Sequence, residues 1–444
     1  MGNKLPIVKN LALDYSSENV LTIYSNGDNS YNTITNLNRR DLNLKKIWIG
    51  NFQCFGVDIY GNFLSWGLND YYQIGNGKKD DYLFNNGNKK IDSFSYLSIT
   101  SNTNYYIKKL NIFKNNFQFP FYGKQVKKVE CGDGFSLFLL DNGQLYGVGR
   151  GDKGQLGWNF PFEEATIVSS KKCLSNVTLN QYFSKKKIYL TNIYCGSDFC
   201  FAKDDKNIYY SWGNNDHHQL CRETFNFVSF EPEIVENLIP YKNIQKICLG
   251  WMHGNFLSAQ NENFIWGNPF YDYDNEFKDY KIPTKIDYPE DLKIIDISCG
   301  FHHICALVVE NDVCQIYTFG ANDFGQLGYN IKSKLYYSTE PKRVIINDDD
   351  PNAFIVELST GAFHTVVRMN NNNIWGFGQN DNKQLGKYNG EHISWPVKWD
   401  YKTDEKLFFY KIICANGSTS VIKIPHQQKL NSIDDEEKIL IINE

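Results

Sequence analysis

VECGDGFSLFLLDNGQLYGVGRGDKGQLG, residues 129–157, is the clearest copy of a pattern that recurs along the chain. Two of its glycines, Gly132 and Gly149, are seventeen residues apart. Four other pairs have the same spacing and one pair is twenty residues apart: Gly50 and Gly67, Gly196 and Gly213, Gly250 and Gly267, Gly361 and Gly378, then Gly300 and Gly320. Self-similarity at a regular spacing predicts a repeat architecture.

Each copy consists of short apolar runs separated by polar turns. In the quoted stretch the run from Ser136 to Leu140 is followed by Asp141-Asn142-Gly143, a strong hairpin signal. Runs of this length that are rich in β-branched and aromatic residues favour strands over helices. A proline-led run such as Pro232 to Val235 follows several copies and fits an outer edge strand, because proline has no N–H to donate.

Each copy therefore predicts a four-stranded antiparallel sheet, and such sheets arranged radially form a propeller. Six complete copies predict six blades. The runs at 408–415 and 418–422 resemble the first half of another copy, and residues 21–26 align with residues 64–69 of the first copy. We expect these end segments to pair in a shared seventh blade, which removes the free sheet edge and closes the ring. The expected fold is thus an all-β, seven-bladed propeller.

We expect this propeller to span residues 19–424, followed by an acidic and then apolar tail at 425–444. Two long insertions interrupt the repeats, at about 78–122 and 158–186. Long loops in a compact domain are often functional, and polar padding is the alternative for both.

Bulk composition excludes several classes of function. The 444 residues contain no apolar run long enough to span a bilayer, so we expect no membrane span and no signal peptide. The net charge is −4, so no bulk attraction to nucleic acid is expected. The eleven cysteines include no Cys-x-x-Cys pair, which favours reduced, packed thiols and no metal site. We also expect a monomer without a cofactor.

Histidine recurs at one position of the repeat, three residues after the first glycine, as His253, His303 and His364. Other copies have Phe135, Phe199 or Gln53 there. A residue that recurs with the repeat serves the repeat, so we predict hydrogen bonds between neighbouring loops. The sequence contains no Gly-x-Ser-x-Gly, no phosphate loop and no His-Glu-x-x-His, and we expect no bond-making chemistry.

The pattern resembles the RCC1 (regulator of chromosome condensation) repeat, and the resemblance implies the seven-bladed propeller of that family. Family members that act on the small GTPase Ran carry Gly-Asp, Cys-Gly-Asn-Asp and His-His in their third, fourth and sixth units. This chain has Gly132-Asp133, Cys195-Gly196-Ser197-Asp198 and His302-His303 in the matching units. The resemblance implies that Asp133, Asp198, His302 and His303 face a Ran-type GTPase and promote guanine-nucleotide exchange in the nucleus.

Two positions depart from the family pattern. A functional histidine of the family's shared blade falls at Ser418, and the family's β-wedge falls at the plain consensus turn Gly149–Gly154. The loop at 158–186 is a candidate substitute for that wedge. Loop aspartates such as Asp133 and Asp198 also often cap turns, which is their structural alternative.

The first eighteen residues contain only Lys4 and Lys9 as basic side chains, so chromatin docking through a basic tail is not favoured. The alternative function is a non-catalytic scaffold that binds another protein, chromatin or lipid headgroups, with a cytoplasmic location as the alternative to the nucleus.

Overall fold

The computed structural model describes residues 22–27, 44–58, 63–75, 77, 120–121, 123–224, 226–270, 279–289, 292–330, 336–386, 388–399, 409–414 and 418–424. Their contacts divide them into two compact units, one within residues 47–286 and the other within residues 287–444 together with the segments 22–27 and 44–46. Each unit is described by itself.

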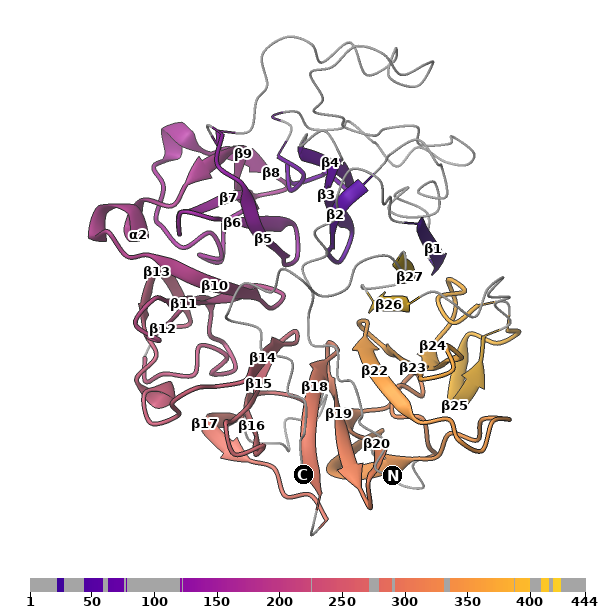
Figure 1. The fold of residues 1–444 in the computed structure, drawn as a ribbon. Helices are drawn as coiled ribbons and strands as arrows, with labels where there is room; N and C mark the ends of the chain where they lie inside the picture. Colours follow the sequence, from indigo (N-terminus) through magenta and orange to yellow (C-terminus); the bar gives the residue numbers. More distant parts are fainter. Residues whose placement is uncertain are drawn as a thin grey trace, which may run out of the picture. The chain divides into compact units, whose positions relative to one another are not determined.

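The described strands form seven antiparallel sheets (Figure 1). In the unit at 47–286, two sheets have four strands: β10 (Leu190–Cys195), β11 (Phe199–Asp204), β12 (Tyr209–Asn214) and β13 (Val228–Ile234), then β14 (Lys246–Leu249), β15 (His253–Leu257), β16 (Asn263–Gly267) and β17 (Tyr280–Lys285). A five-stranded sheet has the order β5-β6-β7-β9-β8, with β5 (Val126–Cys131), β6 (Phe135–Leu140), β7 (Leu145–Arg150), β8 (Thr166–Val168) and β9 (Lys171–Leu179). A three-stranded sheet joins β2 (Leu44–Ile49), β3 (Gln53–Asp58) and β4 (Phe63–Gly67). Short helices are η3 (Phe162–Glu164), α2 (Gln181–Lys186) and η4 (Glu236–Leu238).

The second unit contains the remaining sheets. Two have four strands: β18 (Lys293–Cys299), β19 (His303–Glu310), β20 (Val313–Ala321) and β21 (Tyr337–Val344), then β22 (Ile355–Thr360), β23 (His364–Met369), β24 (Ile374–Gln379) and β25 (His392–Lys398). The last sheet has the order β1-β27-β26, from β1 (Thr22–Gly27), β26 (Phe409–Cys414) and β27 (Ser418–Ile424). In it β1 pairs antiparallel with β27 from Thr22 opposite Lys423 to Gly27 opposite Ser418.

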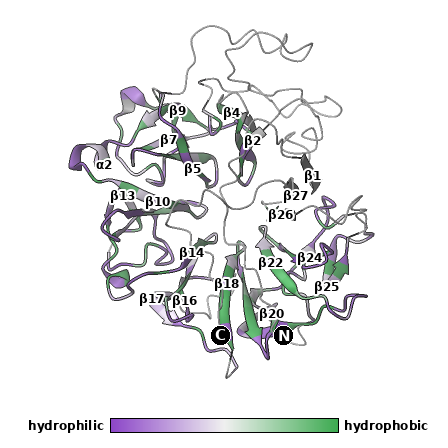
Figure 2. Cartoon of the chain, in the orientation of Figure 1, coloured by the Kyte–Doolittle hydropathy of each residue, from purple (hydrophilic) through white to green (hydrophobic). Residues whose placement is uncertain are grey.

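Four of the seven described sheets have the four antiparallel strands that the repeat predicts; one has five strands and two have three. The run at 136–140 lies in β6, and the hairpin turn after it connects β6 to β7. Pro232 lies in β13, which is the outer strand of its sheet, as the missing N–H of proline predicts. Figure 2 shows hydrophobic residues along strands such as β18 and β22, and hydrophilic residues in α2.

The recurring Gln-Leu-Gly segment closes a tight turn after the third strand of a sheet. In one copy Asn215 Oδ1 accepts from Leu220 N at 3.0 Å, and Gln219 Oε1 accepts from His217 N at 2.7 Å. The asparagine bond recurs at Asn69, Asn322 and Asn380, and the glutamine bond at Gln73, Gln155, Gln326 and Gln384. Amide side chains thus satisfy the backbone of the turn, so this motif serves the fold.

The insertion at 158–186 is part of a sheet rather than a loop. Strand β9 pairs with β7, from Tyr146 opposite Leu179 to Arg150 opposite Cys173, and supplies the fourth strand of its sheet. The first insertion, at 78–122, falls almost entirely outside the described residues, as does the tail at 425–444.

Candidate functional site

Asp133 and Asp198 come from the loops of two different sheets, and Arg150 brings them together. Arg150 is the last residue of β7. Its Nη1 lies 2.5 Å from Asp133 Oδ2, and its Nη2 lies 3.1 Å from Asp198 Oδ1. Its Nε lies 2.7 Å from Asp152 Oδ1. The three carboxylates therefore surround one guanidinium; we call these four residues the Arg150 cluster.

The two loops also contact each other through the backbone. Asp133 N donates to the carbonyl oxygen of Ser197 at 2.8 Å. A Cβ on Gly132 would lie 2.6 Å from that oxygen, so only glycine allows the approach. The next loop repeats the arrangement, because Ser197 N donates to the carbonyl oxygen of Gly250 at 3.3 Å. The recurring Cys-Gly pattern thus marks the place where one sheet's loop rests on the next.

The turn at 149–154 is not the plain consensus turn that the sequence suggested. Gly151 occupies the place where four other copies have the turn asparagine, and Arg150 stands where the other copies have an uncharged residue. A Cβ on Gly151 would lie 2.7 Å from the Phe160 ring, which belongs to the second insertion. The side chain of Arg150 is only 5% exposed. Sequence reasoning missed Arg150, although its departure from the other copies was a usable signal.

The Arg150 cluster has three acidic groups for one base. Exposed fractions are 47% for the Asp133 side chain, 23% for Asp152 and 18% for Asp198. Burial raises the pKa of Asp198 to about 6; Arg150 opposes this rise, while Asp133 and Asp152 add to it. Burial also disfavours the charge on Arg150, but the carboxylates, Asp198 foremost, raise the pKa of its guanidinium above the usual value. The cluster carries a net negative charge near neutral pH.

His302 and His303 lie in the second unit, His302 directly before β19 and His303 as its first residue. Both are buried, at 2% and 0% exposure. His303 Nε2 lies 3.0 Å from Thr365 Oγ1, in the next sheet of that unit, and His364 Nε2 lies 2.9 Å from Thr419 Oγ1. Hydrogen bonds to a neighbouring sheet are therefore present at this repeat position for these two residues, but they join strands rather than the loops that were predicted. Burial, with smaller effects of His364 and His302, lowers the pKa of His303 to about 3.

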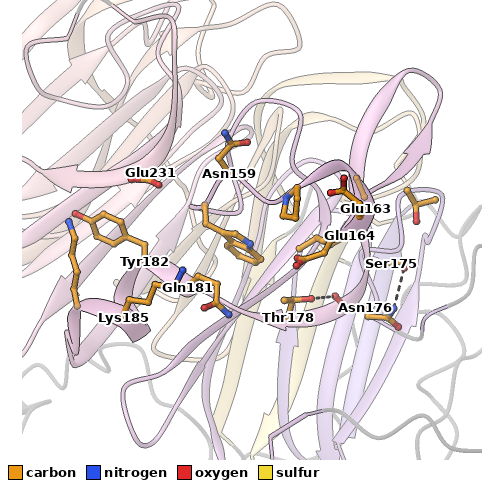
Figure 3. Close-up of a pocket in the computed structure, with 16 residues that line it drawn as sticks. Asn159, Glu163, Glu164, Ser175, Asn176, Thr178, Gln181, Tyr182, Lys185 and Glu231 are labelled. Carbon is orange, nitrogen blue, oxygen red and sulfur yellow. Dashed lines mark hydrogen bonds between the residues drawn. The ribbon is translucent and has the colours of Figure 1, made fainter.

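The second insertion builds a groove of about 1000 Å³ (Figure 3). Tyr182 and Lys185 of α2 lie toward one end of the view, and Glu163 and Glu164 lie on the opposite side. Strand β9 contributes its polar residues 175, 176 and 178 to the wall. Beyond Cys173, β9 has no strand partner on this side among the described residues, since β8 pairs only with residues 171–173.

The described part of the chain lacks two kinds of feature. No set of three or more His, Cys, Asp or Glu side chains there is arranged to hold a metal ion. No described helix is both long and apolar enough to span a bilayer. All eleven cysteines lie in described segments, and all are free thiols.

Three relatives resemble parts of this chain. Human probable E3 ubiquitin-protein ligase HERC4 is 29% identical over 310 residues, which is 60% of this chain and 28% of the ligase. The ultraviolet-B receptor UVR8 of Arabidopsis thaliana is 25% identical over 335 residues, 74% of this chain and 63% of the receptor. An RCC1-like G exchanging factor-like protein of Mus musculus is 24% identical over 254 residues, 55% of this chain and 50% of that protein. Each match spans less than two thirds of the relative.

Solved structures are similar over more of the chain. The crystal structure of Prp20p from Saccharomyces cerevisiae, described with its binding properties to Gsp1p and histones, has a TM-score of 0.67 at 18% identity and covers 94% of this chain and 95% of its own. Human WBSCR16 has a TM-score of 0.64 at 18% identity, over 87% and 88%. The fold is an all-β propeller of four-stranded antiparallel sheets.

The sequence profile of the regulator of chromosome condensation (RCC1) repeat matches residues 126–155, 294–326 and 355–384, and a second profile of that repeat matches residues 315–368. The chain therefore carries RCC1 repeats, and the resemblance seen in the sequence is confirmed.

Proposed function

We propose that this protein is a guanine-nucleotide exchange factor for a Ran-type small GTPase, acting in the nucleus. One observation carries the proposal: Asp133 and Asp198, which depart from the repeat in a family-like order, meet at Arg150 on neighbouring sheets. The resulting acidic surface suits a partner with basic side chains around a nucleotide phosphate site. Exchange requires no covalent step, because binding that favours the nucleotide-free GTPase is enough to release the nucleotide.

The scaffold that presents this surface is, in our proposal, a closed ring of seven blades. Its support is the count of described sheets and the pairing of β1 with β27, which joins the first and last described strands in one sheet. In a closed ring every blade has a neighbour on both sides, and the loops of neighbouring blades are held at fixed relative positions.

His302 and His303 have a different place in this proposal. Both rings are buried, and His303 bonds to Thr365. We propose that they shape the loop at 300–303, whose backbone rests on the next sheet through the bond from Phe301 N to Ala362 O at 2.9 Å. The loop backbone, rather than the imidazoles, would then meet the GTPase.

Release of labelled GDP from Ran tests the proposal. We expect the wild type to accelerate release, and Asp198→Asn and Asp133→Asn to reduce kcat/KM by about 10-fold or more, the loss typical of a charged hydrogen bond. Asp141→Asn is the matched control, since Asp141 is an exposed loop aspartate in the hairpin between β6 and β7. A wild type that leaves the release rate unchanged would overturn the proposal.

The groove of the second insertion favours a second candidate, a scaffold that binds an extended protein segment beside β9. An open strand edge offers backbone hydrogen bonds to an added strand. The variant pair Tyr182→Ala/Lys185→Glu tests it against an array of peptides. Peptides that no longer bind this variant but still bind Asp198→Asn would support the scaffold function. Chromatin and lipid headgroups are alternative ligands of such a scaffold and can be compared in the same way.

A further inference from the structure

We infer that Arg150 is the positioning residue of the partner-binding surface: it holds the carboxylates of Asp133 and Asp198, which come from neighbouring sheets, in one fixed arrangement. The identity of the partner rests on the function proposed above. The arrangement itself rests on the geometry of the Arg150 cluster.

The first argument is the shape of the guanidinium. Its nitrogens lie in one plane and point in fixed directions, so the groups that they bind are held at fixed relative positions. Nη1 contacts Asp133, Nη2 contacts Asp198 and Nε contacts Asp152. Each of the three nitrogens has its own carboxylate. A lysine, whose ammonium is a single point charge, cannot reproduce this pattern.

The second argument is that Arg150 is itself held in place. Its backbone N donates to the carbonyl oxygen of Gly134 at 2.8 Å. A Cβ on Gly134 would lie 2.8 Å from the ring of Tyr71 and 3.4 Å from Cδ of Arg150, so the glycine makes room for both side chains. A buried, packed side chain loses little further freedom when a partner binds, which is what a preorganised site requires.

The third argument is the excess of acid. Two other buried arginines each pair with one carboxylate: Arg222 with Glu233 at 2.8 Å, and Arg368 with Glu357 at 2.9 Å. Neutral oxygens supply their other hydrogen bonds: Ser211 Oγ and Ser229 Oγ for Arg222, and Asn372 Oδ1 for Arg368. A buried arginine of this fold therefore needs only one carboxylate. Three carboxylates around Arg150 repel one another, and buried ion pairs contribute little net stability even when matched. The surplus negative charge therefore does not serve the stability of the fold, and we infer that it serves to bind an external partner.

The geometry has a consequence for pH dependence. The charged groups that face Asp198 are Arg150, Asp133 and Asp152. Burial and the two aspartates raise the pKa of Asp198 to about 6, and Arg150 is the group that opposes this rise. Removing the positive charge of Arg150 should move the pKa of Asp198 further up. Asp198 would then be protonated over more of the neutral range, and partner binding would shift to higher pH.

The experiment measures GDP release from Ran between pH 5.5 and 8.5 for Arg150→Met, Arg150→Lys and Arg222→Met. We expect Arg150→Met to lower kcat/KM about 10-fold and to raise the pH of half-maximal exchange by about 1 unit. Arg150→Lys keeps the positive charge, so its pH of half-maximal exchange should equal that of the wild type. Its kcat/KM should remain at least about threefold below that of the wild type, because lysine cannot bind three carboxylates in fixed directions. Arg222→Met should lower the melting temperature without moving the midpoint.

A second readout does not depend on any GTPase. Hydrogen–deuterium exchange of the wild type and Arg150→Met should show faster exchange in the loops at 131–135 and 196–199, with β14–β16 unchanged. If Ran exchange is absent from the wild type but the two loops loosen together, the proposed function fails and the role of Arg150 stands. The inference is overturned if Arg150→Met matches Arg222→Met in pH midpoint and leaves both loops as protected as in the wild type.

Discussion

A single position of the repeat shows how one side chain joins two sheets. His303 bonds to Thr365, His364 to Thr419, and Gln53 Nε2 to Phe135 O, each in the following sheet. The His303 ring also covers Gly300, where a Cβ would lie 2.1 Å from Cε1. Phe135 and Phe199 cover Gly132 and Gly196 in the same way. The rings of His303, Phe135 and Phe199 thus pack over a glycine, whereas Gln53 joins its neighbouring sheet through the hydrogen bond.

This packing predicts the behaviour of His303→Phe. The folded protein holds the pKa of His303 at about 3, below the value of the unfolded chain, so the unfolded state binds the extra proton. Stability from this residue is therefore complete above about pH 6.5 and falls by about 1.4 kcal/mol per pH unit below it. We expect His303→Phe to lose about 1 kcal/mol at pH 7.5 from the missing bond to Thr365, and to lose less stability than the wild type on acidification.

Urea unfolding at pH 7.5, 5.5 and 4.5 measures this difference. His217→Gln is a control of opposite sign, because the hydrogen bond to Asp279 raises the pKa of His217. The stability that His217 contributes is present at low pH and is lost as pH rises through its folded pKa. Parallel stability curves for the wild type and His303→Phe would contradict the prediction.

At the scale of an element, the short helix α2 anchors the second insertion to the fold. Asn180 caps it, accepting from Phe183 N at 3.2 Å, and its Nδ2 also donates to the carbonyl oxygens of Leu156 and Gly157. Phe183 is buried, with its ring centroid 5.5 Å from that of Tyr210 and 5.6 Å from that of Trp212. The insertion thus contributes core side chains, and polar padding does not describe it.

Phe183→Ala should therefore destabilise the protein by about 3 kcal/mol or more, because it leaves a cavity in a packed aromatic cluster. Chemical denaturation followed by tryptophan fluorescence measures the change. Lys185→Ala, on the exposed side of the same helix, is the matched control and should change stability by less than about 0.5 kcal/mol. Equal effects of the two substitutions would show that the helix is not anchored through its buried face.

At the scale of the whole molecule, the pairing of β1 with β27 joins the first and last described strands of the chain. Thr22–Gly27 and Ser418–Ile424 are paired along the length of β1. Pairing between segments so far apart in the sequence carries a loop-closure entropy cost and is slow to form. This pairing is the basis of the closed ring that we propose.

An engineered disulfide tests the pairing directly. Ser25 lies opposite Ser420 in the register of the two strands. We expect Ser25→Cys/Ser420→Cys to form a cross-link under mild oxidation, because directly opposed residues have a separation suited to a disulfide. Its product would migrate faster on a non-reducing denaturing gel and melt at a higher temperature.

The control is Thr22→Cys/Ser420→Cys, in which the two positions are not opposed. Burial raises the pKa of native thiols such as Cys54 and Cys221 and makes these two poor nucleophiles. Efficient cross-linking of the offset pair alone would show that the register is different.

The sequence predicted most of the strands, because the side chains that form them repeat locally. The spacing of Gly132 and Gly149 corresponds to the strands β6 and β7 and the turns around them. The proline-led outer strands and the interface role of the recurring histidine also follow from local pattern. The insertion at 158–186 interrupts the sequence repeat, so the repeat cannot predict its structure. We expected a loop there, and the structure has the strand β9.

The residue types at the candidate site were also visible in the sequence, as departures of Asp133 and Asp198 from the other copies. Their meeting was not, because it depends on a third departure, Arg150, and on the distance between loops of different sheets. The glycine period fixes where each strand turns, since turns depend on neighbouring residues. Only the tertiary structure decided that one buried guanidinium would hold two distant acids, because burial and charge act through space rather than along the chain.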